Sequence, residues 1–366
     1  MKKMPAPASV ALTTACRGPS PCFKKIEVIP AMGMNIFQIW ADLPEQNDVP
    51  LLVSPSLPQA FQRVFDQQDQ FRASQAFLFG GALLAPFANR IRGQATASGE
   101  ITTVVAGRTI RLAANWSSGR AGGERHAIHG LILDQAAQVL ECNNQAGVLR
   151  AVLHAGNFGG RWFSSCELRF EIKLEPSALG IEVLARNTGN EELPMGMGWH
   201  PYFAIPSGQR ERARIRLPGR FRAETNNPQD VFPTGKLMAI AGSGFDFSAA
   251  KALGDIFLDE SYTDLLRDAD GTASAWLEDD GSHYGLRIRA VSPQVRAFHI
   301  YAPRESAFVA IEPQFNLADP YNPVWENPDT GMVLLKPGES VSYRVRLELY
   351  VPQPGGGTPL SWRRGS

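Results

Sequence analysis

The chain has 366 residues, of which 44% are hydrophobic and 20% are charged, proportions typical of a globular protein with a full-sized core. Its 36 Lys and Arg residues balance its 36 Asp and Glu residues, so the formal net charge is zero. This balance argues against a nucleic-acid partner, which would require excess positive charge to neutralise phosphates. The sequence also lacks an apolar run of about 18 residues, so we expect no membrane-spanning helix and no membrane partner.

The N-terminal segment MKKMPAPASVALTTAC (1–16) combines lysines with a mildly apolar stretch and weakly resembles an export signal. Pro5 and Pro7 interrupt that stretch. We therefore predict a flexible tail over residues 1–22 and a cytoplasmic protein, with periplasmic export as the alternative.

The cysteines are too few for a disulfide framework in a chain of this length, and none forms a CxxC pair. We therefore expect neither a zinc ribbon nor a redox motif and interpret them as reduced thiols. They are Cys16, Cys22, Cys142 and Cys166.

The segment QAFQRVFDQQDQF (59–71) has the clearest helical period and predicts a short helix. Most of the remaining chain consists of short runs rich in Val, Ile, Leu and Phe, separated by Gly, Pro, Asn or Asp, which is typical of strands and turns. The predicted strand regions are 101–115, 166–189, 284–291, 296–303 and 342–351.

Two of these regions alternate strictly between apolar and polar residues, from position 168 to 174 and from 343 to 349. Such alternation indicates strands with one face on a core and one face in water. Turn signals at 175–180 and 187–194 join neighbouring runs, as in antiparallel sheets. We predict an all-β protein, a large antiparallel β-sandwich with few short helices, formed by a single domain over 23–353 and followed by a tail over 354–366.

A first polar cluster lies in GGALLAPFANRIRG (80–93), where Pro86 prevents a regular strand ladder. Asn89 and Arg90 follow it. Arg90 alone is compatible with a surface cation. A planar guanidinium beside an amide is nevertheless suited to bind the hydroxyl oxygens of a polar ligand.

A second cluster, ERHAIHGLILD (124–134), contains His126 and His129 three residues apart, with Glu124 nearby. A zinc site would require a third strong ligand on a fixed helix or hairpin, and nothing nearby supplies one, so we expect no metal. His129 before Gly130 instead indicates an imidazole at the start of a strand with open space beside it.

The third and fourth clusters are GMGWHPYFAIP (196–206), with His200, and AFVAIEPQFNLADPYN (307–322), with Glu312 and Gln314. A lone histidine in an apolar segment is more often structural than functional. A carboxylate at the end of a buried strand, however, usually has a partner or a chemical task. A structural salt bridge is the alternative for Glu312 considered alone.

In the order NRI (89–91), HG (129–130), HPYF (200–203) and EPQ (312–314), these motifs resemble those of the aldose 1-epimerase (galactose mutarotase) family. Each motif is short, whereas their order and joint presence are specific. The segment LLKPGESVSYRVRLELY (334–350) resembles the closing strand of the family, so the resemblance covers nearly the whole chain beyond the N-terminal tail. It implies a galactose mutarotase-like β-sandwich (supersandwich) that acts as an isomerase of hexose metabolism, with a sugar as its partner and without cofactor or metal.

Carried over by motif, the resemblance implies that Glu312 is the general base that deprotonates the anomeric hydroxyl. It also implies that His200 is the general acid that protonates the ring oxygen. His129 would bind or polarise the sugar near the ring oxygen, and Arg90 with Asn89 would hold hydroxyls. We expect opposite charges to favour an ionised Glu312 and a protonated His200 that face each other across a sugar-sized gap.

The segment DIFLDESYTDL (255–265) resembles a further element of the family, with Asp259 as an acceptor of sugar hydroxyls and Asp264 as a weaker candidate. Gln314 would orient the base. Aromatic rings are expected to stack on the sugar, and four histidines are assigned to surface or packing roles. The aromatic candidates are Trp162, Trp199, Tyr202 and Phe203, and the four histidines are His126, His154, His283 and His299.

Two alternatives to an aldose 1-epimerase remain on the same fold, a non-catalytic carbohydrate-binding protein and a hexose-6-phosphate 1-epimerase. The first has no need of both Glu312 and His200. For the second, the arginine that such enzymes tend to show beside the HG motif is missing, which favours free aldoses. A lyase or hydrolase is a third possibility, but hydrolysis would require two flanking carboxylates.

Overall fold

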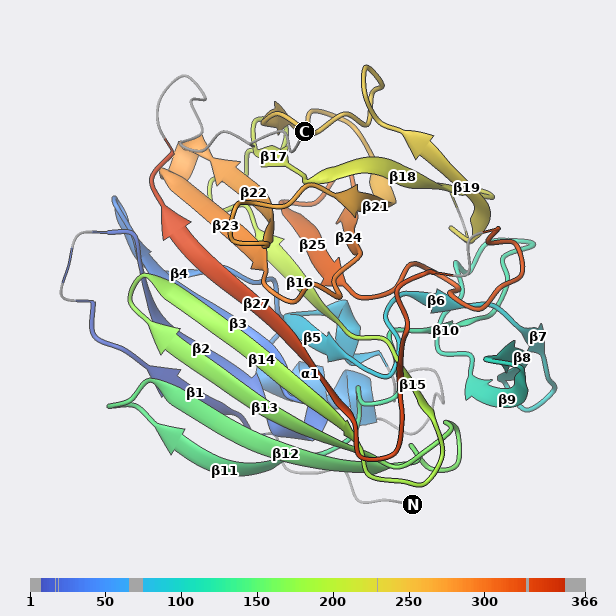
Figure 1. The fold of residues 1–366 in the computed structure, drawn as a ribbon. Coiled ribbons are helices and arrows are strands. Elements are labelled where there is room, and N and C mark those ends of the chain that lie inside the picture. The colour runs from blue at the N-terminus through green and yellow to red at the C-terminus, as the bar shows by residue number, and fades with distance from the viewer. Residues whose placement is uncertain are drawn as a thin grey trace.

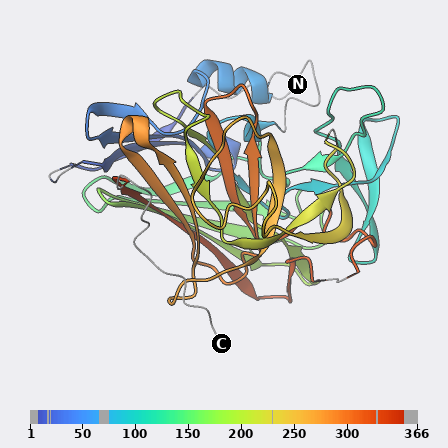
Figure 2. The same ribbon diagram turned by 90° about the horizontal axis from the view of Figure 1, so that it is seen from above.

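The computed structural model describes residues 8–16, 18, 20–65, 75–228, 230–326 and 329–352. These residues form two large antiparallel sheets with a common apolar core, together with one α-helix (Figures 1 and 2). The predicted all-β class and antiparallel sandwich are thereby confirmed. Among the described residues, no helix is long and apolar enough to cross a membrane.

The first sheet has eleven strands in the order β1-β2-β3-β5-β16-β25-β24-β21-β18-β19, with β4 added beside β3. Its strands are β1 (Val10–Thr13), β2 (Cys22–Ile29), β3 (Asn35–Leu43), β4 (Gln46–Pro50), β5 (Gly81–Leu84), β16 (Gly198–Ala204), β18 (Gly219–Thr225), β19 (Pro233–Ala239), β21 (Leu258–Leu265), β24 (Ala297–Ala302) and β25 (Phe308–Gln314).

The second sheet has nine strands in the order β11-β12-β13-β14-β27-β23-β22-β17-β20. Its strands are β11 (Gln138–Asn143), β12 (Val148–Gly156), β13 (Cys166–Glu175), β14 (Ala178–Asn187), β17 (Arg214–Arg216), β20 (Lys251–Ala252), β22 (Ala273–Asp279), β23 (Tyr284–Ala290) and β27 (Ser340–Tyr350).

Small elements complete the described chain, mostly as short pairs of strands. They are β6 (Arg90–Ile91) with β10 (Ala127–Ile128), β15 (Leu193–Met195) with β26 (Val333–Leu335), and β7 (Gln94–Ala95) with β8 (Glu100–Val105) and β9 (Arg108–Ala113). The helices are α1 (Leu57–Phe65) and three 3₁₀ turns, η1 (Pro30–Met32), η3 (Ala76–Leu78) and η4 (Asp280–Ser282). The predicted helix 59–71 is confirmed as far as Phe65; residues 66–71 lie outside the described residues.

Strand β13 shows how the alternating pattern builds the second sheet. Leu168, Phe170 and Ile172 are buried in the core, whereas Arg169 and Lys173 are exposed on the other side. The predicted turn at 175–180 is the hairpin that joins β13 to β14. One face of this sheet therefore lies on the core and the other lies in water.

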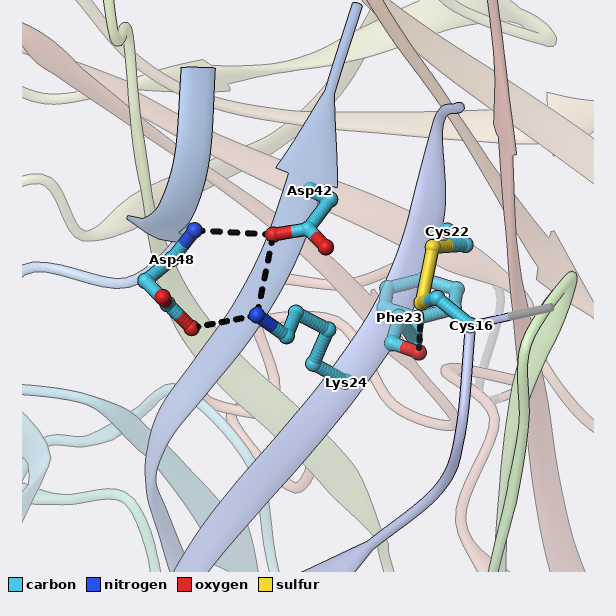
Figure 3. Close-up of a disulfide and its surroundings, with 6 residues drawn as sticks. All are labelled: Cys16, Cys22, Phe23, Lys24, Asp42 and Asp48. Atoms are coloured by element: carbon cyan, nitrogen blue, oxygen red, sulfur yellow. Dashed lines mark hydrogen bonds and ion pairs between the residues drawn. A yellow bond between two sulfur atoms is a disulfide. The ribbon is translucent and has the colours of Figure 1, made fainter. Parts of the chain in front are cut away.

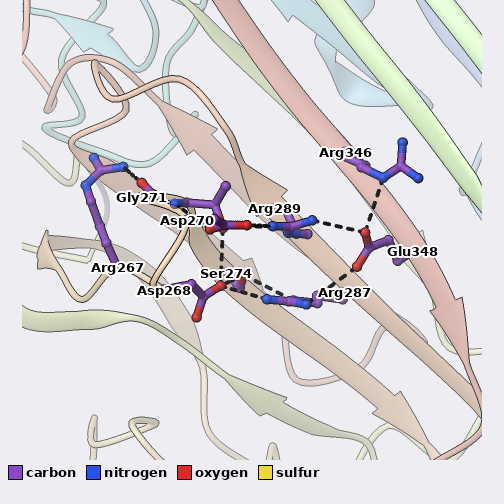
Figure 4. Close-up of polar contacts among 10 residues, drawn as sticks. Arg267, Asp268, Asp270, Gly271, Ser274, Arg287, Arg289, Arg346 and Glu348 are labelled. Carbon is purple, nitrogen blue, oxygen red and sulfur yellow. Dashed lines mark hydrogen bonds and ion pairs between the residues drawn. The ribbon is translucent and has the colours of Figure 1, made fainter. Parts of the chain in front are cut away.

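Ion pairs cover the outer face of β22, β23 and β27 (Figure 4). Arg287 lies 2.7 Å from Asp268, and both Arg289 and Arg346 lie 3.2 Å from Glu348. Of these pairs, Arg289–Glu348 joins the neighbouring strands β23 and β27, and it favours their pairing only modestly because water screens exposed charges. The strands of the second sheet thus present charged side chains to solvent and keep their apolar side chains for the core.

The prediction of a flexible tail over residues 1–22 is wrong for its described part. Val10–Thr13 form β1, which pairs with β2, and Leu12 is fully buried. A disulfide joins Cys16 to Cys22, so the interpretation of all four cysteines as reduced thiols is also wrong (Figure 3). The spacing of six residues gave no recognised motif, and only the hairpin geometry brings the two thiols together. The predicted tail over 354–366 lies outside the described residues.

Lys24, on β2 next to the disulfide, is bound by two carboxylates, at 3.2 Å from Asp42 and 2.7 Å from Asp48 (Figure 3). The backbone amide of Asp48 also donates to Asp42. These contacts connect β2 to β3 and β4. The N-terminal edge of the first sheet is thus held by a covalent bond and a small polar network.

We predict that thiol titration distinguishes the two cysteine pairs. The denatured, unreduced protein should contain two reactive thiols, Cys142 and Cys166, and prior reduction should raise the number to four. In the native state Cys142 should react first, because Cys166 is buried and its thiol pKa is raised to about 12 by burial. Four reactive thiols without reduction would contradict the disulfide.

Candidate active site

The centre of the site is a row of four side chains across adjacent strands of the first sheet. Ser261 on β21 is paired with His299 on β24, and His299 is paired with Glu312 on β25. Strand β16 pairs Gly198 with Gln314 and Tyr202 with Ala310 of β25. Midway between these pairs, His200 lies opposite Glu312. Residues directly opposite in antiparallel strands have Cβ atoms about 5 Å apart, so the row brings three ionisable groups into contact range.

Alternation along the strands explains why these polar residues share one face. On β16, Trp199 and Phe203 point into the core, and on β24, Phe298 and Ile300 do the same. The intervening residues therefore point to the opposite side of the sheet. Helix α1 and turn η3 cover the neighbouring part of that side over β3 and β5, which leaves the polar row at the edge of a cleft.

The cleft holds about 950 Å³ of empty space, part of it open to solvent. Its buried part carries the ionisable groups, and its mouth carries half-exposed or exposed side chains. The lining residues are Phe77, Leu78, Arg90, Trp116, Ser118, Arg120, Ile128, His129, His200, Tyr202, Pro228, Phe257, Asp259, His299, Tyr301 and Glu312.

The short strand pair of β6 and β10 brings Arg90 and His129 to the cleft. His129 donates its backbone amide to the carbonyl of Asn89 at 3.0 Å. Both residues have left-handed backbones, with φ of 59° at Asn89 and 63° at His129. Non-glycine residues in this conformation are uncommon and concentrate at functional sites, where the surrounding structure offsets the strain.

Gly130 makes this approach sterically feasible. Its φ is +83°, and a Cβ atom at this position would lie 2.3 Å from the carbonyl oxygen of Ala85. Any other residue would push the segment away from Ala85 and displace His129. The HG motif therefore has a steric reason in this fold.

Glu312 and His200 contact each other directly. His200 Nε2 lies 3.3 Å from Glu312 Oε1, and their side chains are only 6% and 0% exposed. Gln314 donates from Nε2 to Glu312 Oε2 at 2.8 Å, which is the orienting contact expected for Gln314. The expected sugar-sized gap between Glu312 and His200 is absent, although both side chains line the same cleft.

The expectation of an ionised Glu312 and a protonated His200 is not met in the free site, because both side chains are buried. Desolvation raises the pKa of Glu312 well above its usual range, and the nearby charge of Asp259 adds to that rise. Desolvation also lowers the pKa of His200 to about 3, with a further contribution from His299. The free site therefore favours the uncharged forms of both groups, because a low-dielectric environment penalises charge.

Asp259 remains ionised despite its burial. Burial alone would raise its pKa, but Arg90 and His299 outweigh that effect and bring the pKa to about 2. Arg90 Nη2 lies 3.2 Å from Asp259 Oδ2, and His299 Nε2 lies 3.0 Å from Oδ1. A carboxylate with two such donors is a strong hydrogen-bond acceptor at the wall of the cleft.

Asn89 supports this ion pair and does not line the cleft. It is fully buried, and its Oδ1 accepts hydrogen bonds from the backbone amide of Arg90 at 2.9 Å and from Arg90 Nη1 at 3.1 Å. Asn89 Oδ1 is thus engaged with Arg90, whereas Nδ2 has no partner among the described residues, and the expected contact of Asn89 with sugar hydroxyls stays a prediction. Its observed contacts orient the guanidinium.

His299 is the site residue that the sequence analysis missed. Its sequence context predicts a surface or packing role, but His299 lines the cleft and contacts Asp259 and Ser261. His154 and His283 are exposed and paired with Glu167 and Glu45, in keeping with surface roles. His299 stands in RAFHIYAP without a neighbouring motif, so only strand pairing shows its role.

His126 and Asp264 do not belong to the cleft. The ring of His126 is buried against Phe232, and its Nδ1 lies 3.2 Å from the carbonyl of Glu124. Asp264 is 42% exposed and bound to Arg220. Asp259 is thus the acidic residue of segment 255–265 that reaches the cleft.

Aromatic rings form two walls that extend from the histidines to the mouth. On one side His200 contacts Tyr202, and Tyr301 contacts Phe257 at the rim. On the other side Phe77 contacts His129 and His200 as well as Trp116. Of the four aromatic residues expected to stack on a sugar, Tyr202 lines the cleft, whereas the other three lie in the core. These core residues are Trp162, Trp199 and Phe203.

Unsatisfied polar atoms gather at this site. Among the described residues, a small group of buried nitrogen and oxygen atoms has no hydrogen-bond partner, and many of them belong to the cleft or its support. Buried polar atoms without partners are costly in a folded protein, so their clustering indicates a place that receives a polar ligand. These atoms include Arg90 Nε, Asn89 Nδ2, His129 Nδ1, His200 Nδ1, Glu312 Oε1 and Gln314 Oε1.

His129, His200 and Glu312 each offer a ligand atom, and these atoms lie within 4.8 Å of one another. Such spacing is compatible with a metal ion, although the sequence suggests only His126 and His129 with Glu124 as ligands to consider and predicts no metal. However, Glu312 Oε1 and His200 Nε2 already face each other at 3.3 Å. The pair therefore has proton-transfer geometry without any additional group.

The chain matches a protein-family model, and its fold matches several solved structures. The family model described as Aldose 1-epimerase matches residues 57–348. Comparison of the sequence with the curated proteins finds no match.

Solved structures with the same fold include the GalM/aldose epimerase homologue from C. elegans. It is 15% identical with a TM-score of 0.71, and the match covers 94% of this chain and 99% of that chain. Galactose 1-epimerase from Lactobacillus acidophilus NCFM is 15% identical with a TM-score of 0.64 and the same coverages. A galactose mutarotase-like protein from Clostridium acetobutylicum is 17% identical with a TM-score of 0.66, over 90% and 92% of the two chains.

We predict that Asp259 contributes pH-dependent stability. Its pKa falls from 3.8 to about 2 on folding, so its contribution is present above about pH 4 and is lost as the pH falls toward 2. The difference in unfolding free energy between the wild type and Asp259→Asn should shrink by about 2 kcal/mol over that range. Denaturant titrations at several pH values measure this difference, and a constant difference would contradict the ion-pair assignment.

Proposed function

The chain belongs to the aldose 1-epimerase family, and we propose that it interconverts the α and β anomers of free aldoses by acid–base ring opening and closure. The observation that carries the proposal is the contact of Glu312 with His200 at 3.3 Å in a cleft lined by aromatic rings. The family and the fold support the epimerase class. The free-sugar substrate and the roles of the residues are the proposal.

The chemistry requires two proton transfers, at the two oxygens O1 and O5 that are bonded to C1. A base takes the proton from the anomeric O1 hydroxyl as the C1–O5 bond breaks, and the electron pair of that bond remains on O5. An acid protonates O5, which leaves an open-chain aldehyde. After rotation about C1–C2, the roles reverse. The former acid takes the proton back from O5 as O5 attacks the other face of the carbonyl, and the former base returns its proton to O1.

Direct contact between Glu312 and His200 suits this reaction better than a wide gap. O1 and O5 are bonded to the same carbon, so the groups that serve them must be close neighbours. In this proposal Glu312 serves O1 and His200 serves O5. The two side chains lie in one row of the sheet, on the same side of the bound sugar.

The uncharged pair already contains the single proton that the mechanism needs. Transfer of that proton from Glu312 to His200 along their contact produces a carboxylate base and an imidazolium acid without exchange with solvent. Gln314 stabilises the carboxylate by its hydrogen bond to Oε2. Oε1, which accepts no hydrogen bond in the free site and lies 3.3 Å from His200 Nε2, is then the atom that accepts the O1 proton.

The remaining cleft residues bind the sugar. Asp259 accepts hydrogen bonds from hydroxyls, Arg90 donates to them, and His129 lies beside His200 with ring centroids 4.6 Å apart. Tyr202 and Phe77 present apolar surface to the C–H face of a pyranose. These roles require no cofactor and no metal.

We also propose that the chain folds in an oxidising compartment, in place of the cytoplasmic location expected from the sequence. The disulfide between Cys16 and Cys22 supports this, because disulfides persist in secreted and periplasmic proteins and are rare in the cytosol. The predicted thiol count, measured on protein isolated from its native host, tests this proposal.

We predict that Glu312→Gln and His200→Ala each reduce the catalysed rate about 100-fold or more, because each removes one of the two proton-transfer groups. Polarimetry of freshly dissolved α-glucose and α-galactose measures the approach to equilibrium. His283→Ala is the matched control, since His283 is exposed and remote from the cleft, and it should retain the wild-type rate. A fully active Glu312→Gln variant would refute the assigned base.

A hexose-6-phosphate 1-epimerase is the second candidate, favoured by the position of Arg120 at the exposed mouth of the cleft. Because Arg90 is bound to Asp259, Arg120 is the cationic lining residue available to a phosphate. We expect glucose to be converted with a higher kcat/KM than glucose 6-phosphate, and Arg120→Ala to leave both values within about threefold. A tenfold loss confined to the phosphorylated sugar would favour the second candidate.

A further inference from the structure

Both ring nitrogens of His299 are engaged, which distinguishes it from the other cleft histidines. Nε2 lies 3.0 Å from Asp259 Oδ1, and Nδ1 lies 2.9 Å from Ser261 Oγ. By contrast, His129 and His200 each have a ring nitrogen without a partner. A ring fixed at both ends and 5% exposed cannot turn toward a sugar without losing a hydrogen bond.

The partners of His299 keep its orientation independent of its charge. Asp259 accepts the Nε2 hydrogen in either state of the imidazole. The Ser261 hydroxyl can donate to an unprotonated Nδ1 or accept from a protonated one, because a hydroxyl is both donor and acceptor. The His299–Asp259 contact is therefore retained whether the ring is neutral or charged.

Asp259 is held between two donors on different elements. Arg90 on β6 approaches Oδ2 at 3.2 Å, and His299 on β24 donates to Oδ1. Among the described residues, Arg90 alone contacts Oδ2, so this oxygen retains acceptor capacity on the side of the cleft. Without His299 the carboxylate could rotate about its Cα–Cβ and Cβ–Cγ bonds and lose its direction.

We propose that His299 is a positioning residue that fixes Asp259 as the acceptor of a sugar hydroxyl. The inference rests on the proposed function and specifies what sets sugar affinity in this cleft. A hydroxyl that is remote from C1 is bound equally in the ground state and the transition state. Its loss therefore raises KM and leaves kcat unchanged.

The test is a set of variants measured by polarimetry with glucose and galactose. His299→Ala should raise KM about tenfold and keep kcat within about twofold. The reason is that the misdirected Asp259 carboxylate no longer accepts the hydrogen bond of the sugar hydroxyl. His299→Gln, which can still donate to Asp259, should recover KM to within about threefold of the wild type. His154→Ala, at an exposed histidine, is the matched control and should change neither constant.

A double-mutant cycle decides whether His299 acts through Asp259. The effect of His299→Ala on KM should vanish in the Asp259→Asn background, since the group that it positions has been changed. A tenfold effect that persists in that background would overturn the proposal. A loss of kcat at unchanged KM would also overturn it, because His299 would then act on the proton transfers.

Binding experiments separate this inference from the proposed function. Trp116 lines the cleft, so sugar binding should change tryptophan fluorescence and give a Kd without turnover. If the wild type accelerates no sugar but binds one, the proposed function fails, and a tenfold weaker Kd for His299→Ala still supports the positioning role. An unchanged Kd for His299→Ala would overturn that role whether or not turnover occurs.

Discussion

The register of four antiparallel strands is the constraint on which the site depends. It places Ser261, His299, Glu312 and His200 in one row across β21, β24, β25 and β16. Because side chains alternate between faces, a slip of one residue in any strand would exchange a polar member of the row for a core residue. The apolar residues between them, such as Trp199 and Ile311, oppose that slip, since they are fully buried. Packing of the core thus fixes the chemistry of the opposite face.

Ionisable groups so close together in a desolvated cleft are costly, and the site reduces that cost in two ways. Arg90 and His299 keep Asp259 ionised by pairing with it, as its pKa of about 2 indicates. Glu312 and His200 avoid the cost by remaining uncharged, because burial favours the neutral form of each group. Two carboxylates on one wall therefore differ in charge, which suits one to hydroxyl binding and the other to proton transfer.

The contacts that the sequence patterns did not predict have a common physical cause. The adjacency of Asn89 and Arg90 predicts one shared role, whereas Arg90 lines the cleft and Asn89 lies behind it. His299 had no motif beside it, and its importance follows from strand pairing alone. The same holds for Cys16 and Cys22, whose separation of six residues resembles no redox motif until a hairpin joins them. In each case a contact between residues from different strands or across a turn was decisive.

By itself the sequence determined the alternating strands, the antiparallel sandwich and the family, because periodicity and motif order are local or linear properties. It also supplied Arg90, His129, His200, Asp259 and Glu312 as candidates, since each lies in or beside a short pattern. The tertiary structure alone decided that Glu312 touches His200, that their charged forms are disfavoured, and that His299 secures Asp259. Those facts depend on register and burial, which no local pattern of residues encodes.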